Sequence, residues 1–383
     1  AVAGAVRGAE IMRRMPGHER YKILHRASEL MTEQLEDLGR TISSEEGKIL
    51  AEGVFEASRS KETIELSAEE AKRIRGEVLP LDGAPGGADR LGFTLRVPCG
   101  VVAAITPFNF PLNLVCHKVG PALAAGNSVI IKPASDTPLS ALKIVRILLE
   151  AGLPPEAIAC ITGSGGDVGD TLCGDPRVRK ISFTGSREIG EHICRVAGLK
   201  KVTMELGSNS PLIVMPDANL DRVAEATVAT GFSNAGQVCI SAQRVVVLEP
   251  VYQEFLERLT PRVKALATGN QLDSATKMGP MIRESDAVRV SQWIDEAVSD
   301  GARLLTGGGR RGTLVEPAVV ADVSPAMKIS CDELFGPAVA VSKVTSIEEA
   351  IQMANDTRYG LSAAIFTENI NWALRFAKHV DSG

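Results

Sequence analysis

Apolar residues such as Ile23, Ala27 and Leu30 recur three and four positions apart through residues 1–75, with charged residues between them. This spacing places the apolar side chains on one face of a helix. The N-terminal part of the chain is therefore predicted to form a run of amphipathic helices.

A break in this pattern follows the helical stretch. Residues 80–90 are rich in glycine and proline, which is typical of turns. The flanking segments 77–79 and 93–97 carry apolar and β-branched residues and are predicted to be the arms of a β-hairpin.

Short apolar segments alternate with helical ones from Val101 to Val214, and a second alternation begins after Asn219. Such alternation is typical of a parallel sheet with crossover helices. The sequence thus predicts an α/β protein. The predicted strands are 101–105, 128–131, 158–162, 180–184, 201–206 and 244–248, and the predicted helices are 139–151, 220–232 and 251–267.

Charge and composition narrow the class of partner. The 383 residues have a net charge of −5, so no basic field favours nucleic acid or an acidic membrane. The longest apolar runs are as short as strands, and no transmembrane or secretory segment is visible. Seven cysteines without a C-x-x-C pair and five histidines without ligand spacing predict no disulfide frame and no metal site. We expect a cytoplasmic protein with a small-molecule partner.

Two glycine-rich turns follow predicted strands, at residues 163–169 and 185–190. A strand, a glycine turn and a helix form a dinucleotide site when the backbone N–H groups at the helix start face a phosphate. The same glycines also occur in plain tight turns, so each motif alone leaves both interpretations open.

Three residues have the chemistry for covalent catalysis. Cys239 offers a thiol, Glu205 a carboxylate base, and Asn109, in a loop between two prolines, a side-chain N–H for an oxyanion. Each has a simpler interpretation: a lone cysteine is commonly a buried core residue, and such an asparagine is commonly a turn residue.

The chain resembles the aldehyde dehydrogenase superfamily over nearly its whole length. Six segments carry the likeness, in the family's order and spacing. They are Pro107–Pro111, Gly126–Pro133, Phe183–Gly190, Met204–Gly207, Gly236–Cys239 and Glu333–Pro337.

The resemblance implies a hydrolytic mechanism that yields a free acid. Cys239 attacks the aldehyde to form a thiohemiacetal, whose oxyanion is held by the Asn109 amide and the Cys239 backbone N–H. Hydride transfer to the nicotinamide leaves a thioester, and Glu205 activates the water that hydrolyses it.

For the cofactor, the resemblance places Lys132 on the adenosine ribose, Glu333 on the nicotinamide ribose and Phe335 near the nicotinamide ring. Without it, Lys132 and Glu333 would be interpreted as solvated charges. The remaining expected cofactor contacts are Ile105, Thr106, Ser135, Gly165, Gly185 and Ser186.

Two departures from the family pattern affect the expectations. Ser135 replaces the glutamate that binds a ribose 2′-hydroxyl and repels a 2′-phosphate, so NAD or NADP is expected, with NADP tolerated. Ser208 replaces a glycine and is expected to stiffen the loop beside the base.

The expected fold has a Rossmann-like parallel-sheet cofactor domain and an α/β catalytic domain. The NAD(P)-binding domain comprises 1–76 and 98–206, a hairpin for oligomerisation comprises 77–97, and the catalytic domain comprises 207–383. We expect a homodimer or homotetramer. Family members are longer, so the opening strands and the C-terminal part of the catalytic domain are expected to lie outside this chain.

The substrate is expected to be a small polar aldehyde such as lactaldehyde, glycolaldehyde or succinic semialdehyde. Arg59 could select an anionic substrate, although a helix arginine is commonly solvated. The candidate pocket wall comprises Phe108, Leu112, Val238 and Ile240.

Two alternatives to this function stay open. One is a CoA-acylating semialdehyde dehydrogenase, against which Glu205 argues because an activated water would destroy the thioester. The other is a non-catalytic binding or structural protein that keeps the fold, against which the retained Asn109, Glu205 and Cys239 argue.

Overall fold

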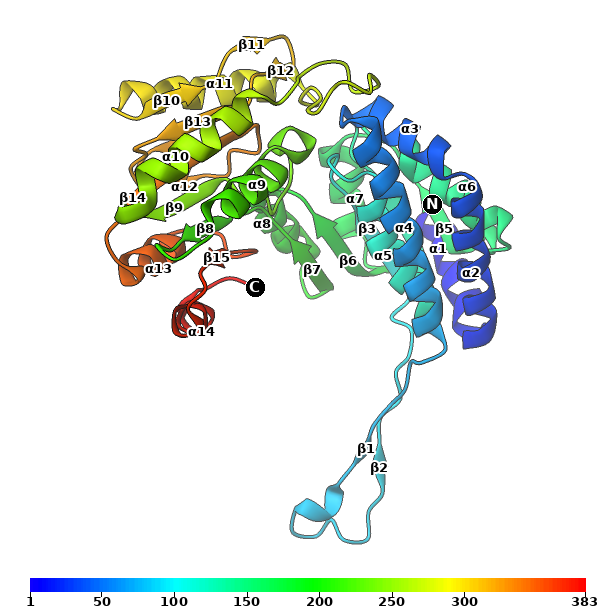
Figure 1. Ribbon diagram of the computed structural model, residues 1–383. Coiled ribbons are helices and arrows are strands. Elements are labelled where there is room, and N and C mark those ends of the chain that lie inside the picture. The colour runs from blue at the N-terminus through cyan, green and yellow to red at the C-terminus, as the bar shows by residue number, and fades with distance from the viewer. The chain divides into compact units, whose positions relative to one another are not determined.

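The computed structural model describes residues 1–383 as two compact units (Figure 1). Unit 1 comprises Ala1–Ile42 and Val54–Glu205, and unit 2 comprises Ser43–Gly53 and Leu206–Gly383. The segment Ser43–Gly53 lies within the N-terminal helical run, and the sequence did not set it apart. Its contacts nevertheless group it with the C-terminal unit.

Unit 1 contains a five-stranded sheet in the order β5-β4-β3-β6-β7, and every pairing is parallel. The predicted parallel sheet is confirmed. Its strands are β3 (Val101–Ile105), β4 (Ser128–Lys132), β5 (Ile158–Cys160), β6 (Val178–Thr184) and β7 (Lys201–Glu205).

Helices from the N-terminal run and the two that follow β3 and β4 share one apolar core with this sheet. Met12, Leu24, Ile64 and Ile144, from four different helices, pack in the same cluster as the strand residue Val129. The predicted amphipathic helices therefore bury their apolar faces as expected. The helices are α1 (Val2–Arg14), α2 (Gly17–Glu33), α3 (Leu35–Glu46), α4 (Leu50–Ala71), α5 (Asn113–Ala124), α6 (Leu139–Glu150), α7 (Asp170–Gly174) and α8 (Arg187–Ala197), and α3 and α4 contain residues of both units.

The predicted hairpin is present. β1 (Val78–Leu79) pairs antiparallel with β2 (Gly92–Phe93), and Figure 1 shows the hairpin projecting from the helices of unit 1. Large apolar side chains on it are exposed, including Leu91 and Leu95. The hairpin therefore carries an exposed apolar surface.

Unit 2 contains a six-stranded sheet in the order β10-β13-β14-β9-β8-β15. All pairs are parallel except β10 with β13. The strands are β8 (Pro211–Val214), β9 (Arg244–Leu248), β10 (Arg303–Thr306), β13 (Ala318–Ala321), β14 (Ala338–Val344) and β15 (Ala364–Phe366), with a separate ribbon of β11 (Arg310–Arg311) and β12 (Leu314–Val315). The helices are α9 (Leu220–Gly231), α10 (Glu249–Lys264), α11 (Glu284–Ser299), α12 (Lys328–Cys331), α13 (Ile347–Asn355) and α14 (Ile370–His379).

Candidate active site

The order of the strands in unit 1 marks a position for a ligand. The chain adds β4 and β5 on one side of β3, then crosses to add β6 and β7 on the other. In open parallel sheets, ligands bind beyond the carboxyl ends of the strands where the order reverses, here between β3 and β6. Ile105, Thr106, Lys132 and Gly185 lie at or directly after the carboxyl ends of β3, β4 and β6.

Lys132 ends β4 and is only 5% exposed, so the interpretation of it as a solvated charge is wrong. Its Nζ donates to the carbonyl of Pro133 at 3.0 Å, and burial lowers its pKa. The neighbouring Thr106 donates its backbone N–H to the Lys132 carbonyl at 3.2 Å, but its buried hydroxyl has no hydrogen-bond partner. An unsatisfied buried hydroxyl beside a buried amine fits a site that a polar ligand completes.

The two glycine turns begin short helical segments. Ser164 accepts the N–H of Asp167, and Ser186 is the N-cap of α8 and accepts the N–H of Ile189 at 3.5 Å. A Cβ added at Gly165 would meet no atom within 4 Å, so the space beside this glycine is open to a ligand. Ser135 is exposed, and its hydroxyl donates to the carbonyl of Gly163 at 3.3 Å. These features fit a dinucleotide with its phosphates near the turns.

Asn109 is buried in the loop that joins β3 to α5. The loop is held by Glu56 of α4, whose Oε1 accepts the backbone N–H groups of Leu112 and Asn113, both at 3.0 Å. Leu112, a candidate for the pocket wall, is fully buried and packs in the core of unit 1. The sequence did not predict this role of Glu56, because a glutamate within one helix carries no sign that it will cap the start of another helix far along the chain.

Glu205 ends the edge strand β7 and is exposed, and its carbonyl accepts the N–H of Gly185 at 3.1 Å. The buried Lys118 of α5 donates from Nζ to Thr184 Oγ1 at 2.7 Å and to Ser182 Oγ at 3.3 Å. Burial lowers the pKa of Lys118 to about 8, while the charge of Glu205 acts in the opposite direction. The charge of Glu205 is therefore close enough to act on the buried Lys118.

Cys239 follows a segment of left-handed backbone in unit 2. Asn234, Ala235 and Gly236 have φ values of 49°, 53° and 72°. Asparagine and glycine tolerate this conformation, whereas alanine carries a strain of about 1 kcal/mol. A Cβ on Gly236 would lie 2.1 Å from the carbonyl oxygen of Gly336, so only glycine fits this contact. The cysteine is therefore presented by a closely packed, conformationally unusual loop.

Three segments meet at the amino ends of neighbouring parallel strands in unit 2. Ser208 precedes β8, Cys239 precedes β9 and Glu333 precedes β14. Ser208 donates its N–H to Glu333 Oε1 at 2.9 Å, and its Oγ accepts the N–H of Ser210 at 3.1 Å. Ser210 Oγ donates to the carbonyl of Cys239 at 3.4 Å. The serine in place of glycine at 208 closes this loop, and its backbone orients Glu333.

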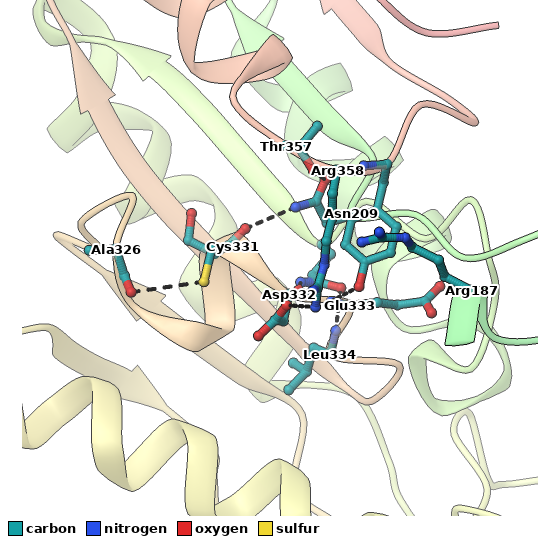
Figure 2. Close-up of polar contacts among 12 residues, drawn as sticks. Arg187, Asn209, Ala326, Cys331, Asp332, Glu333, Leu334, Thr357 and Arg358 are labelled. Atoms are coloured by element: carbon teal, nitrogen blue, oxygen red, sulfur yellow. Dashed lines mark hydrogen bonds and ion pairs between the residues drawn. The ribbon is translucent and has the colours of Figure 1, made fainter. Parts of the chain in front are cut away.

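Figure 2 shows how the Glu333 segment is held in unit 2. Asp332 pairs with Arg358. The backbone N–H of Leu334 donates to Gln243 Oε1 at 2.7 Å. Gln243 Nε2 donates back to the carbonyl of Asp332 at 2.7 Å. Phe335 then adopts a left-handed φ of 49°. These contacts fix the backbone on both sides of Glu333.

Four of the other cysteines have raised pKa values. Burial raises the pKa values of Cys160 and Cys173 to about 11, and it also raises those of Cys116 and Cys331. A raised pKa suppresses the reactive thiolate. No disulfide is present.

The remaining pocket candidates differ in exposure. Phe108 and Val238 are half-buried, and Ile240 is exposed. No three His, Cys, Asp or Glu side chains gather in a group that could hold a metal ion. No helix is long and apolar enough to cross a membrane.

Unit 1 thus offers a topological switch point in a parallel sheet, and unit 2 offers a cysteine in a rigid loop. Both features are compatible with an oxidoreductase that forms a covalent intermediate. A model described as the aldehyde dehydrogenase family matches residues 1–383, and the chain belongs to this family. The predicted family, fold class and enzyme class, an NAD(P)-dependent aldehyde dehydrogenase, are confirmed.

Several characterised proteins are similar to this chain. The 3-sulfolactaldehyde dehydrogenase of Priestia aryabhattai is 45% identical over 96% of this chain and 77% of its own length. A lactaldehyde dehydrogenase of Methanococcus maripaludis is 40% identical over 98% of this chain and 80% of its own length. The structure of glyceraldehyde-3-phosphate dehydrogenase GapN from Methanocaldococcus jannaschii complexed with NADP has a TM-score of 0.96 and 38% identity, and it is matched over 100% of this chain and 83% of that one.

Proposed function

We propose that this enzyme oxidises a small polar aldehyde to the free carboxylic acid, with Cys239 as nucleophile. The observation that carries the proposal is the rigid loop of unit 2, which holds Cys239 behind three left-handed residues and beside the Glu333 segment. Such a loop keeps a thiol and its own backbone N–H in one orientation, as preorganised catalysis requires.

Each step follows from residue chemistry. The Cys239 thiolate attacks the aldehyde carbon, and the Asn109 amide and the Cys239 N–H donate to the oxyanion. With NAD or NADP bound, the nicotinamide would accept the hydride that the thiohemiacetal carbon loses as it becomes the Cys239 thioester. Glu205 then removes a proton from the water that attacks the thioester, which releases the acid and restores the thiol.

The cofactor contacts remain part of the proposal. Lys132 holds the adenosine ribose, Glu333 holds the nicotinamide ribose and Phe335 packs near the nicotinamide. We further propose Ile105, Thr106, Ser135, Gly165, Gly185 and Ser186 along the dinucleotide. The buried Lys132 and the unsatisfied hydroxyl of Thr106 support this assignment.

Substitution of Cys239 tests the mechanism. Cys239→Ala should abolish NAD(P)H production and leave cofactor binding intact. Glu205→Gln should slow turnover on the order of a hundredfold and leave a rapid first burst of NAD(P)H, because only hydrolysis of the thioester is impaired. Undiminished turnover by Cys239→Ala would refute the assignment.

For the substrate, we propose a hydroxyaldehyde of the lactaldehyde type. The two relatives named for lactaldehyde and 3-sulfolactaldehyde support this class. Arg59 is exposed on α4. Burial lowers the pKa of His117 on α5, and the positive charge of Arg59 lowers it further. This positive field favours an anionic substrate.

A panel of neutral and anionic aldehydes with both cofactors tests the substrate class. Arg59→Ala should lower kcat/KM for 3-sulfolactaldehyde and succinic semialdehyde but not for lactaldehyde and glycolaldehyde. Equal losses on all four would remove the proposed role of Arg59. Product formation that strictly requires CoA would favour the acylating alternative instead.

We also propose that unit 1 contains the NAD(P)-binding domain, that unit 2 contains the catalytic domain, and that residues 77–97 mediate a homodimer or homotetramer. The exposed Val78, Leu91, Phe93 and Leu95 of the hairpin support this role. Replacing Leu91 and Phe93 with serine should lower the mass measured by light scattering. A reducing compartment such as the cytoplasm fits the seven thiols.

A further inference from the structure

We infer that Glu46 and Glu52 are positioning residues for Cys239, which they orient through Asn234. The inference rests on the proposed function, in which Cys239 is the nucleophile. Both carboxylates come from Ser43–Gly53, the N-terminal segment that groups with unit 2. Neither touches a reacting atom in the proposed mechanism, so their effect must pass through the cysteine loop.

Glu52 holds the first residues of that loop. Its Oε1 accepts the Ser233 hydroxyl at 2.6 Å and the backbone N–H of Asn234 at 3.0 Å. One oxygen therefore satisfies two donors at the point where the backbone turns left-handed. Loss of this oxygen would leave both donors without their acceptor, so the two hydrogen bonds resist relaxation of the strained segment.

Glu46 holds the side chain of the same asparagine. It is 1% exposed, and its Oε1 accepts from Asn234 Nδ2 at 2.8 Å. Its second oxygen accepts the backbone N–H of Lys48 at 2.9 Å. Because both oxygens face donors, only an ionised carboxylate fits; an amide would direct its NH2 group at one of them.

Hydrogen bonds also hold the part of the loop between Asn234 and Cys239. Gln237 Nε2 donates to the carbonyl of Asn234 at 3.1 Å, and Gln237 Oε1 accepts the N–H of Ile282 at 3.0 Å. Asn234 is thus bound at its N–H, its side chain and its carbonyl, five residues before Cys239. A displacement of about 1 Å in a reacting group can reduce the rate on the order of a hundredfold, so this anchoring bears directly on catalysis.

Matched substitutions test the inference on the full-length chain. Glu52→Gln keeps an oxygen that can accept both donors, whereas Glu52→Ala removes it. Glu46→Gln keeps the shape but places a donor against a donor. Glu62→Ala, an exposed glutamate on the same helix as Glu52, is the control.

Three measurements separate positioning from folding. The first is the rate of Cys239 alkylation by iodoacetamide across pH, followed at the Cys239 peptide. The second is kcat with saturating cofactor, and the third is the Kd for NADP. We expect Glu46→Gln and Glu52→Ala to lower kcat about tenfold or more and to shift the alkylation profile, with Kd unchanged. Glu52→Gln and Glu62→Ala should stay close to the wild type.

The outcomes distinguish this inference from the proposed function. Wild-type alkylation and kcat in folded Glu46→Gln and Glu52→Ala would overturn the inference, as would a lowered melting temperature with an unchanged alkylation profile. If Glu52→Ala does not fold, the comparison of Glu46→Gln with Glu52→Gln decides. Retained turnover in Cys239→Ala would instead refute the proposed function itself.

Discussion

The carboxylate of Glu56 accepts the backbone N–H of Leu112 at 3.0 Å, and the same oxygen accepts the N–H of Asn113 at 3.0 Å. Leu112 is the N-cap of α5, and its own side chain provides no capping hydrogen bond. A buried carboxylate 56 positions earlier in the chain therefore performs the capping. It also complements the positive end of the helix dipole. Because Asn109 lies three residues before this cap, Glu56 fixes the end of its loop.

Removal of this cap should affect both stability and catalysis. Glu56→Ala leaves two buried N–H groups without an acceptor and should lower the free energy of unfolding by about 2 kcal/mol. Denaturant unfolding measures this. Because we propose that Asn109 binds the oxyanion, Glu56→Ala should also lower kcat, but only while Asn109 is present. An equal further loss in the Asn109→Ala background would contradict this coupling.

Gly236→Ala should destabilise unit 2. The new methyl group would lie 2.1 Å from the Gly336 carbonyl oxygen, and the φ of 72° disfavours alanine. We expect a loss of more than about 2 kcal/mol, measured by thermal unfolding, because a backbone carbonyl cannot move aside cheaply. Gly83→Ala is the control, since no atom lies within 4 Å of the added group. A similar melting temperature for the two variants would contradict the prediction.

Lys118 should make stability rise at alkaline pH. Burial lowers its pKa from 10.5 to about 8, so below pH 8 the lysine is charged in both states and the folded state bears the desolvation penalty. Between pH 8 and 10.5 the folded state loses the proton while the unfolded state retains it. Stability therefore increases with pH by up to about 3 kcal/mol.

Comparison with Lys118→Met isolates this titration. The variant removes the buried charge, so its stability relative to the wild type should be greatest near pH 7 and should decline as pH approaches 10.5. Denaturant unfolding at several pH values measures the difference. A difference that does not change with pH would show that Lys118 does not titrate in this window.

Ser135→Glu should convert the cofactor preference toward NAD. The exposed Ser135 hydroxyl donates to the Gly163 carbonyl beside a glycine turn. A carboxylate there would repel a 2′-phosphate and accept a 2′-hydroxyl, so kcat/KM with NADP should fall about tenfold or more while NAD is retained or improved. Initial rates with both cofactors measure the ratio, and Ser135→Gln controls for size. An unchanged ratio would place the ribose elsewhere.

The sequence by itself determined the elements and the family. The alternation after Val101 predicted parallel strands, and the helical spacing before residue 75 predicted amphipathic helices; both depend on local periodicity, which sequence records directly. The motifs around Asn109, Glu205 and Cys239 indicated the enzyme class because each joins a reactive group to a turn. The family comparison confirmed that class.

Only the tertiary structure decided which charges are buried and what they hold. From the residues alone Lys132 was interpreted as a solvated charge, yet it is buried at the carboxyl end of the inner strand β4. In the sequence, Glu46, Glu52 and Glu56 look like ordinary helical glutamates. In the structure, their carboxylate oxygens accept hydrogen bonds from loops 56 to 188 positions away. Long-range hydrogen bonds leave no periodic trace in a chain, because their partners are chosen by packing rather than by spacing.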